Sequence, residues 1–147
     1  MTETNTLELN MLTPEGVEEL WPKIEPMLTA ACEGNEIARE EFTAEDIREL
    51  GVQGLCAVFV GTIDDEPACT VVIQFNITNG RKGADIIAMG GKHLLTFKAH
   101  YWDILLEWLK ANGIEFLDAY VPEDRADIYK RRFKFDKSCA YVRMSLH

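Results

Sequence analysis

Residues 84–98 read Ala84-Asp-Ile-Ile-Ala-Met-Gly-Gly-Lys-His-Leu-Leu-Thr-Phe-Lys98, and the change of pattern within them decides the fold. The apolar run from Ala84 to Met89 is typical of a buried strand. Two glycines follow, and an amphipathic helix is predicted from there to Asn112. Such an arrangement can bind an anionic phosphate, because backbone N–H groups point out of a helix start and glycines let a ligand approach them closely. A tight turn without a ligand is the simpler interpretation of the same glycines.

The N-terminal residues predict one strand and two helices. Apolar and polar residues alternate from Leu7 to Leu12, which indicates a half-buried strand. Thr13-Pro14-Glu15 is a helix start, and Pro22 and Pro26 are expected to bend or split the helix that follows. After a loop at 33–35, Thr43-Ala-Glu-Asp46 is a capping sequence for a short second helix that ends near Gly51.

The middle of the chain predicts an antiparallel meander. Strands are expected at 55–63, 68–77 and 84–89, and residues 64–67 and 79–83 have the composition of turns. The strand at 84–89 is instead followed by a helix and a further strand at 114–121. A crossover helix joins parallel strands, so the fourth and fifth strands are predicted to be parallel.

The C-terminal third completes the predicted order. Asn112-Gly113 is a helix C-cap, a helix is expected at 122–132, and a last strand at 139–146. On the helix before Asn112, we expect Tyr101, Ile104, Leu105 and Trp108 to be mostly buried against the sheet and Trp102 to be partly exposed. The order is then β-α-α-β-β-β-α-β-α-β, an α/β (α+β) fold in one domain over residues 1–147, with no internal repeat or linker.

Composition and charge narrow the function classes. Apolar residues make up 47% of the 147, which indicates a folded globular protein, and no apolar run is long enough to span a bilayer. Residues 1–79 carry three Lys/Arg against sixteen Asp/Glu, and residues 80–147 carry twelve against nine, so the net charge of −10 is the sum of −13 and +3. Such an acidic chain does not favour nucleic acid as a partner. Four widely spaced cysteines without a Cys-x-x-Cys pair favour reduced thiols in a cytoplasmic protein and give no metal site.

The element order resembles the GNAT superfamily of N-acetyltransferases, and the resemblance extends over nearly the whole chain. Leu12-Thr-Pro-Glu15 is similar to the family's opening, and Tyr129-Lys-Arg-Arg-Phe-Lys-Phe135 is similar to its closing helix, where a Tyr precedes a Gly-Phe pair. The segment Trp21 to Pro26 resembles short, divergent GNAT-like proteins of bacteriophages. The resemblance implies that the fourth and fifth strands splay apart and that acetyl-CoA binds in the wedge between them.

The resemblance also implies site residues. The cofactor-binding residues would be Met89, Gly90, Gly91, Lys92, His93 and Leu94, whose backbone would hold the pyrophosphate, with Lys92 or Lys98 at a phosphate. Tyr129 would be the acid that protonates the thiolate leaving group. For the base that accepts the proton of the amine, Asp85 is our first candidate, and His93 and Asp118 are alternatives.

Three differences from the family pattern bear on activity. The pyrophosphate loop lacks its leading Arg or Gln, the Gly-Phe pair is Lys134-Phe135, and Tyr129 lies six residues before Phe135 instead of five. A one-residue shift on a helix rotates a side chain by roughly 100°.

Two function classes follow, with a third behind them. The first is an N-acetyltransferase that moves an acetyl group from acetyl-CoA to an amine on a small molecule or a protein. The second is a catalytically degenerate GNAT-fold binding or structural protein, virion-associated or directed at a host protein if it is phage-encoded. A second copy of the chain is another candidate partner. Nucleic-acid mimicry by the acidic half ranks last.

Overall fold

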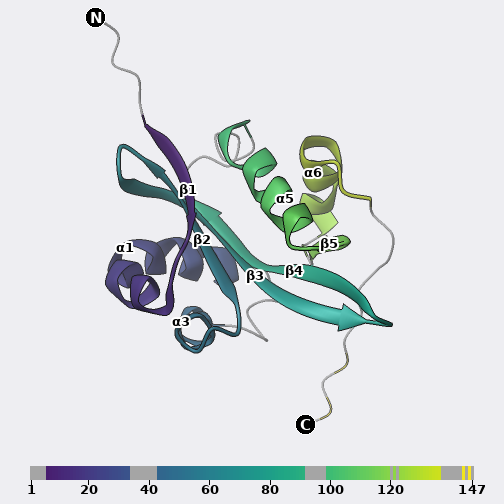
Figure 1. The fold of residues 1–147 in the computed structure, drawn as a ribbon, viewed down its shortest axis with the longest axis horizontal. Coiled ribbons are helices and arrows are strands. Elements are labelled where there is room, and N and C mark those ends of the chain that lie inside the picture. The colour runs from purple at the N-terminus through teal and green to yellow at the C-terminus, as the bar shows by residue number, and fades with distance from the viewer. Residues whose placement is uncertain are drawn as a thin grey trace, which may run out of the picture.

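A single five-stranded sheet organises the molecule, whose computed structural model describes residues 6–33, 43–91, 99–119, 121, 123–136, 144 and 146. The strands lie in the order of the chain (Figure 1). They are β1 (Leu7–Met11), β2 (Ala57–Ile63), β3 (Glu66–Thr78), β4 (Arg81–Gly91) and β5 (Phe116–Ala119). Strands β1 to β4 pair antiparallel and β5 pairs parallel to β4, which confirms the predicted mixed sheet.

Strands β4 and β5 separate part of the way along β4. Among the described residues, their pairing runs from Gly83–Phe116 to Ile86–Ala119, whereas β4 stays paired with β3 as far as Gly91. A bulge interrupts the β3–β4 register at Ile87, just beyond the last β4–β5 pair. Bulges bend a strand and increase its twist, so this one turns the end of β4 away from β5. The predicted splay of these two strands is therefore present.

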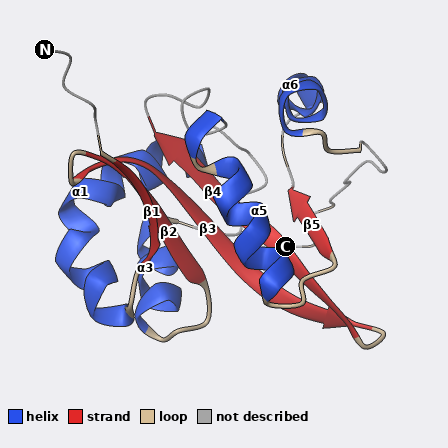
Figure 2. Ribbon diagram, turned by 45° about the horizontal axis from the view of Figure 1, so that its top comes forward, coloured by secondary structure: helices blue, strands red, loops and turns tan. Residues whose placement is uncertain are grey.

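Helices α1 (Pro14–Glu33) and α3 (Ala44–Val52) cover one face of the sheet. Figure 2 shows both on the side of the sheet opposite α5. Their apolar faces bury Val17, Trp21, Ile24, Leu28 and Ile47 against β2, β3 and the end of β4. Pro22 and Pro26 do not split α1, because both lie on its exposed side, while the buried side packs continuously.

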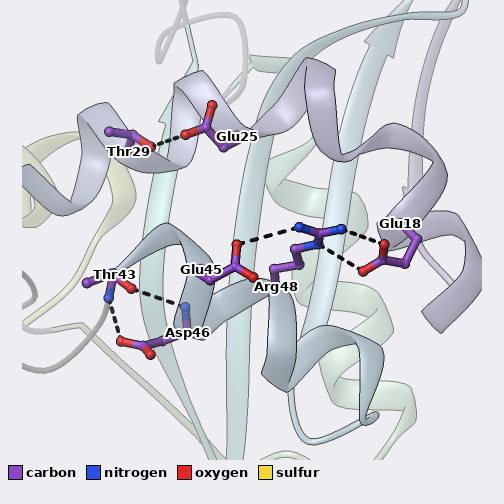
Figure 3. A network of polar contacts seen from close by, with 7 residues as sticks. All are labelled: Glu18, Glu25, Thr29, Thr43, Glu45, Asp46 and Arg48. Atoms are coloured by element: carbon purple, nitrogen blue, oxygen red, sulfur yellow. Dashed lines mark hydrogen bonds and ion pairs between the residues drawn. The ribbon is translucent and has the colours of Figure 1, made fainter.

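Arg48 of α3 joins the two helices (Figure 3). Its Nε and Nη2 donate to the two carboxylate oxygens of Glu18 on α1, at 2.9 and 2.7 Å, and its guanidinium lies 5.8 Å from the ring centre of Trp21. The hydrogen bond from Arg48 lowers the pKa of Glu18. The predicted cap of α3 is present as a full capping box between Thr43 and Asp46.

Helices α5 (Trp102–Ala111) and α6 (Glu123–Phe133) lie on the other face. Tyr101 and Leu105 are buried as predicted, but the predictions for two neighbours were wrong. Trp102 is only 4% exposed and Ile104 is 51% exposed. The reason is tertiary: the Trp102 ring lies 4.8 Å from that of Phe133 on α6, so α6 covers a side of α5 that the sequence leaves open.

The remaining differences concern boundaries. β4 starts at Arg81 and ends at Gly91, so Gly90 and Gly91 are strand residues and the prediction of a glycine turn there was wrong. Asn112-Gly113 ends α5 as predicted, with Gly113 at a φ of 76°. The loop at 34–35 and most of the predicted strand at 139–146 lie outside the described residues.

Candidate functional site

Two carboxylates lie opposite each other on the parallel pair of strands. Asp85 of β4 is the register partner of Asp118 of β5, one residue before the last pair of the two strands. Ala84 and Ile86 pack into the core under α5, so alternation places the Asp85 side chain on the other face. There Asn76 Nδ2 donates to Asp85 Oδ2 at 2.9 Å. The base candidate is thus held at the point where the sheet opens.

The surroundings of Asp85 favour its protonated form. Partial burial raises the pKa of the carboxyl, the negative charge of Asp118 raises it further, and the hydrogen bond from Asn76 opposes both. A carboxyl with a raised pKa is a stronger base at neutral pH than an ordinary aspartate. This combination of burial and a like charge is typical of functional sites.

A polar cleft of about 610 Å³ adjoins this pair. Gly83 lies at its floor, where a Cβ would come 2.7 Å from Asn76 Oδ1. The guanidinium of Arg81 lies 5.8 Å from the ring centre of Phe116. The lining residues come from β3, β4, β5 and the turn at the tip of the β3–β4 hairpin: Asn76, Thr78, Asn79, Arg81, Gly83, Phe116 and Asp118.

Tyr129, the acid candidate, lies on the other face of the sheet from Asp85. It belongs to the core cluster under α5 and α6, where its ring lies 5.5 Å from that of Phe133 and 5.8 Å from that of Phe135. Lys134 has a φ of 64°, in the left-handed region, at the position of the glycine in the family's Gly-Phe pair. The two catalytic candidates therefore do not share one face, and they can approach the same group only through the opening between β4 and β5.

The two glycines of the cofactor candidates have structural neighbours. A Cβ on Gly90 would lie 2.5 Å from the carbonyl oxygen of Met27 on α1, and a Cβ on Gly91 would lie 2.6 Å from that of Ala68. Gly91 also has a φ of 145°. Met89 packs against the core under α5. Close backbone packing thus accounts for both glycines, and the other cofactor candidates, Lys92, His93, Leu94 and Lys98, lie outside the described residues.

Sequence reasoning missed most of the cleft. Asn76 and Gly83 were not candidates, although they position Asp85 and form the floor beside it. One signal was present: Gln74, Asn76 and Thr78 alternate with Phe75 and Ile77, which marks a polar face on a strand that is otherwise apolar. Arg81 was not a candidate either, and Phe116 was predicted only as part of the strand at 114–121.

Among the described residues there is neither a membrane-spanning helix nor a cluster of metal ligands. None of their helices combines the length and the apolar character that crossing a bilayer requires. In the same part of the chain, His, Cys, Asp and Glu side chains nowhere gather in threes or more as a metal ion would need.

Known structures share this architecture. A ribosomal-protein-alanine N-acetyltransferase from Brucella melitensis biovar Abortus 2308 superposes with a TM-score of 0.66 at 11% identity, over 97% of this chain and 99% of its own. An aminoglycoside acetyltransferase from an uncultured soil metagenomic sample, in complex with sisomicin, gives 0.70 at 12% identity over 96% and 97%. The aminoglycoside N-acetyltransferase AAC(6')-Iy, in complex with CoA, gives 0.70 at 7% identity over 99% and 98%.

Sequence comparisons find no counterpart. No protein-family model matches the chain, and no curated protein matches it either. Identities this low show a shared fold and nothing finer. Together with the mixed sheet and the splayed β4 and β5, the superpositions over almost the whole length show that this chain has the GNAT acetyltransferase fold.

Proposed function

We propose that this protein is an acyl-CoA-dependent N-acetyltransferase whose reaction takes place at the opening between β4 and β5. One observation carries the proposal: Asp85, a carboxyl with a raised pKa, lies one residue before the point where the two strands part. The solved structures that share the fold are named as acetyltransferases, and one of them is a complex with CoA. A fold alone does not determine function, so the proposal depends on the site.

The residues at the opening fit an acyl-CoA thioester in part. Beyond Ile86, β4 continues to Gly91 with no β5 partner among the described residues, so one edge of its backbone can pair with the amides of a pantetheine arm. The cofactor would run from this edge towards Met89, Gly90 and Gly91, and the cations Lys92 and Lys98 would meet its phosphates. Gly90 and Gly91 are already packed against protein backbone, so the phosphate contacts would come from residues that follow them.

The proposed chemistry assigns one proton transfer to each face of the sheet. Bound acetyl-CoA supplies an activated acyl carbon and a thiolate leaving group. Asp85 accepts the proton that the amine loses as its nitrogen bonds to the acyl carbon. Tyr129 gives its phenolic proton to the sulfur as the C–S bond breaks. The amine would arrive from the cleft beside Asp85, and the thiolate would leave towards α6.

The alternative is a catalytically degenerate, phage-encoded GNAT-fold protein that binds a partner without turnover. Gly90 and Gly91 favour this alternative, because close backbone packing explains both glycines without a cofactor. As an acetyltransferase the protein would work in the cytoplasm, and virion association belongs to the second proposal.

Calorimetric titration with acetyl-CoA separates the two proposals. The acetyltransferase is expected to bind it at micromolar concentration and to release free thiol when amines are added. Desulfo-CoA serves as a control for the binding step, since it keeps the nucleotide and the pantetheine amides. The absence of binding at millimolar acetyl-CoA would refute the transferase and leave the binding protein.

A further inference from the structure

The cleft beside Asp85 is built as a grid of side chains from three neighbouring strands. The register pairs Asn76 with Gly83, and Gly83 with Phe116, which makes the central row. Gly83 has no side chain, and the amide of Asn76 lies over it, with Oδ1 2.7 Å from where a Cβ would stand. Figure 1 shows that the tip of the β3–β4 hairpin extends beyond α1 and α3.

The two ends of the cleft carry opposite charges. The row towards the opening holds the carboxylates of Asp85 and Asp118, and the row towards the hairpin tip holds Thr78 and Arg81. Arg81 and Asp85 are four residues apart on one strand, a separation of about 13 Å along the backbone. Both side chains are on the same face, and a long arginine side chain shortens the gap between the charged groups.

We propose, resting on the transferase function above, that this cleft selects a small acceptor that carries both a primary amine and a carboxylate. The amine would lie between Asp85 and Asp118, next to the opening, and the carboxylate would pair with the guanidinium of Arg81. Asn76, Thr78 and Asn79 supply hydrogen bonds between these ends, and Phe116 supplies the one apolar wall.

Other acceptor classes fit the charges less well. A polyamine would place a second positive charge near Arg81, where like charges repel. An acceptor with a long apolar chain would cover the polar groups of Thr78 and Asn79 without offering them hydrogen bonds. A guanidinium that also stacks on an aromatic ring is suited to a planar carboxylate, because it offers two parallel N–H donors.

The arrangement also orders the proton transfer. The acceptor arrives as an ammonium ion, and the two aspartates attract this charged form. The ammonium ion gives one proton to the solvent, and Asp85 takes a second as the neutral nitrogen bonds to the acyl carbon, while Tyr129 protonates the departing sulfur and the acceptor's carboxylate is unchanged throughout. Arg81 is therefore a specificity residue that touches the acceptor but not the reacting atoms.

The test compares acceptors in matched pairs that differ only in the carboxylate. β-Alanine, γ-aminobutyrate and lysine are each titrated into the protein by calorimetry against their neutral amides, and each is then offered with acetyl-CoA. We expect at least one carboxylate to be preferred over its amide by roughly tenfold in Kd and in kcat/KM, which corresponds to about 1.4 kcal/mol.

Two variants identify the cation responsible. Arg81→Gln should remove the preference, so that each carboxylate and its amide bind with similar affinity. Lys82→Gln makes the same change of charge at the next residue, which faces Gly113 on the α5 side of the sheet, and it should keep the preference. Both side chains are exposed, and circular dichroism checks that both variants fold.

The outcomes separate this inference from the proposed function. Acetyl transfer to amines without any carboxylate preference, or with a preference that survives Arg81→Gln, overturns the inference and keeps the transferase. If the carboxylates bind more tightly than their amides through Arg81 but no turnover occurs, the inferred binding site stands and the transferase function is refuted. If none of the acceptors binds at millimolar concentration, the inference is wrong.

Discussion

Asp85 and Asp118 face each other across β4 and β5, one residue before the two strands stop pairing. Burial raises the pKa of Asp85, and the negative charge of Asp118 raises it further. The pair adjoins both the cleft and the opening. The predictions below begin with this relationship.

Replacing Asp85 with Asn keeps the size of the side chain and removes the base. Turnover with an amine acceptor should fall by roughly 10²–10⁴-fold, the range for one acid–base group, while the affinity for acetyl-CoA stays the same. An assay of thiol release measures the turnover, and calorimetry measures the affinity for acetyl-CoA. A variant that keeps more than half of the wild-type kcat would exclude Asp85 as the base.

The same variant should change how stability depends on pH. Because the folded state raises the pKa of Asp85 above its ordinary value of 3.8, the folded protein binds more protons than the unfolded chain between the two values. The contribution of Asp85 to stability therefore falls as pH rises through this window, and Asn contributes no such loss. Urea unfolding should show that the free energy of unfolding of Asp85→Asn increases relative to that of wild type as the pH rises from acidic to neutral. If the difference in free energy of unfolding between the two proteins does not change with pH, the pKa of Asp85 is not raised.

Changes to the two neighbours of Asp85 should shift its pKa in opposite directions. Asn76→Ala removes the hydrogen bond that favours the carboxylate, so the acid limb of the pH profile of kcat/KM should move to higher pH. Asp118→Asn removes the like charge, so the limb should move to lower pH. Shifts in the same direction, or no shift in either, would show that another group controls this limb.

Tyr129→Phe tests the proposed acid. Phenylalanine keeps the ring contacts with Phe133 and Phe135, so folding and acetyl-CoA affinity should be unchanged. If the phenol protonates the thiolate, kcat should fall by roughly 10²–10⁴-fold. A parallel fall in affinity and rate would make Tyr129 a packing residue.

Leu105 and Ile104 form a matched pair on α5. Leu105 is fully buried, so Leu105→Ala should lower the free energy of unfolding by about 2–5 kcal/mol. Ile104 is half exposed, and Ile104→Ala should cost well under about 1 kcal/mol. Urea unfolding of both variants measures the difference, and equal losses would place the buried face of α5 elsewhere.

Lys134 offers a stabilising substitution. Its backbone is left-handed, which costs a residue with a Cβ roughly 1–2 kcal/mol and costs glycine almost nothing. Lys134→Gly should therefore raise the free energy of unfolding by up to about 1 kcal/mol after the entropy of glycine is subtracted. Lys134→Ala also loses the contact from Nζ to the carbonyl of Arg131 but should give no such gain, which separates the two effects.

The sequence alone determined the order of the elements and the parallel pairing of β4 and β5. Alternation, capping residues and turn composition are local properties, and a crossover helix leaves only one direction for the strand after it. The same logic made Asp85 a candidate, because a carboxylate within an apolar strand is visible without a structure. The two caps of α3 and α5 were predictable for the same local reason.

Tertiary structure decided the rest. The side of α5 that is buried depends on where α6 packs, so Trp102 and Ile104 were misassigned. The role of Gly90 depends on the carbonyl of Met27, which lies more than sixty residues away in the sequence. The local sequence therefore predicted a turn at Gly90, where the structure has a strand packed against α1. The cleft arises because Asn76, Gly83 and Phe116 become neighbours only when the register of three strands is set, and register is a property of the whole sheet.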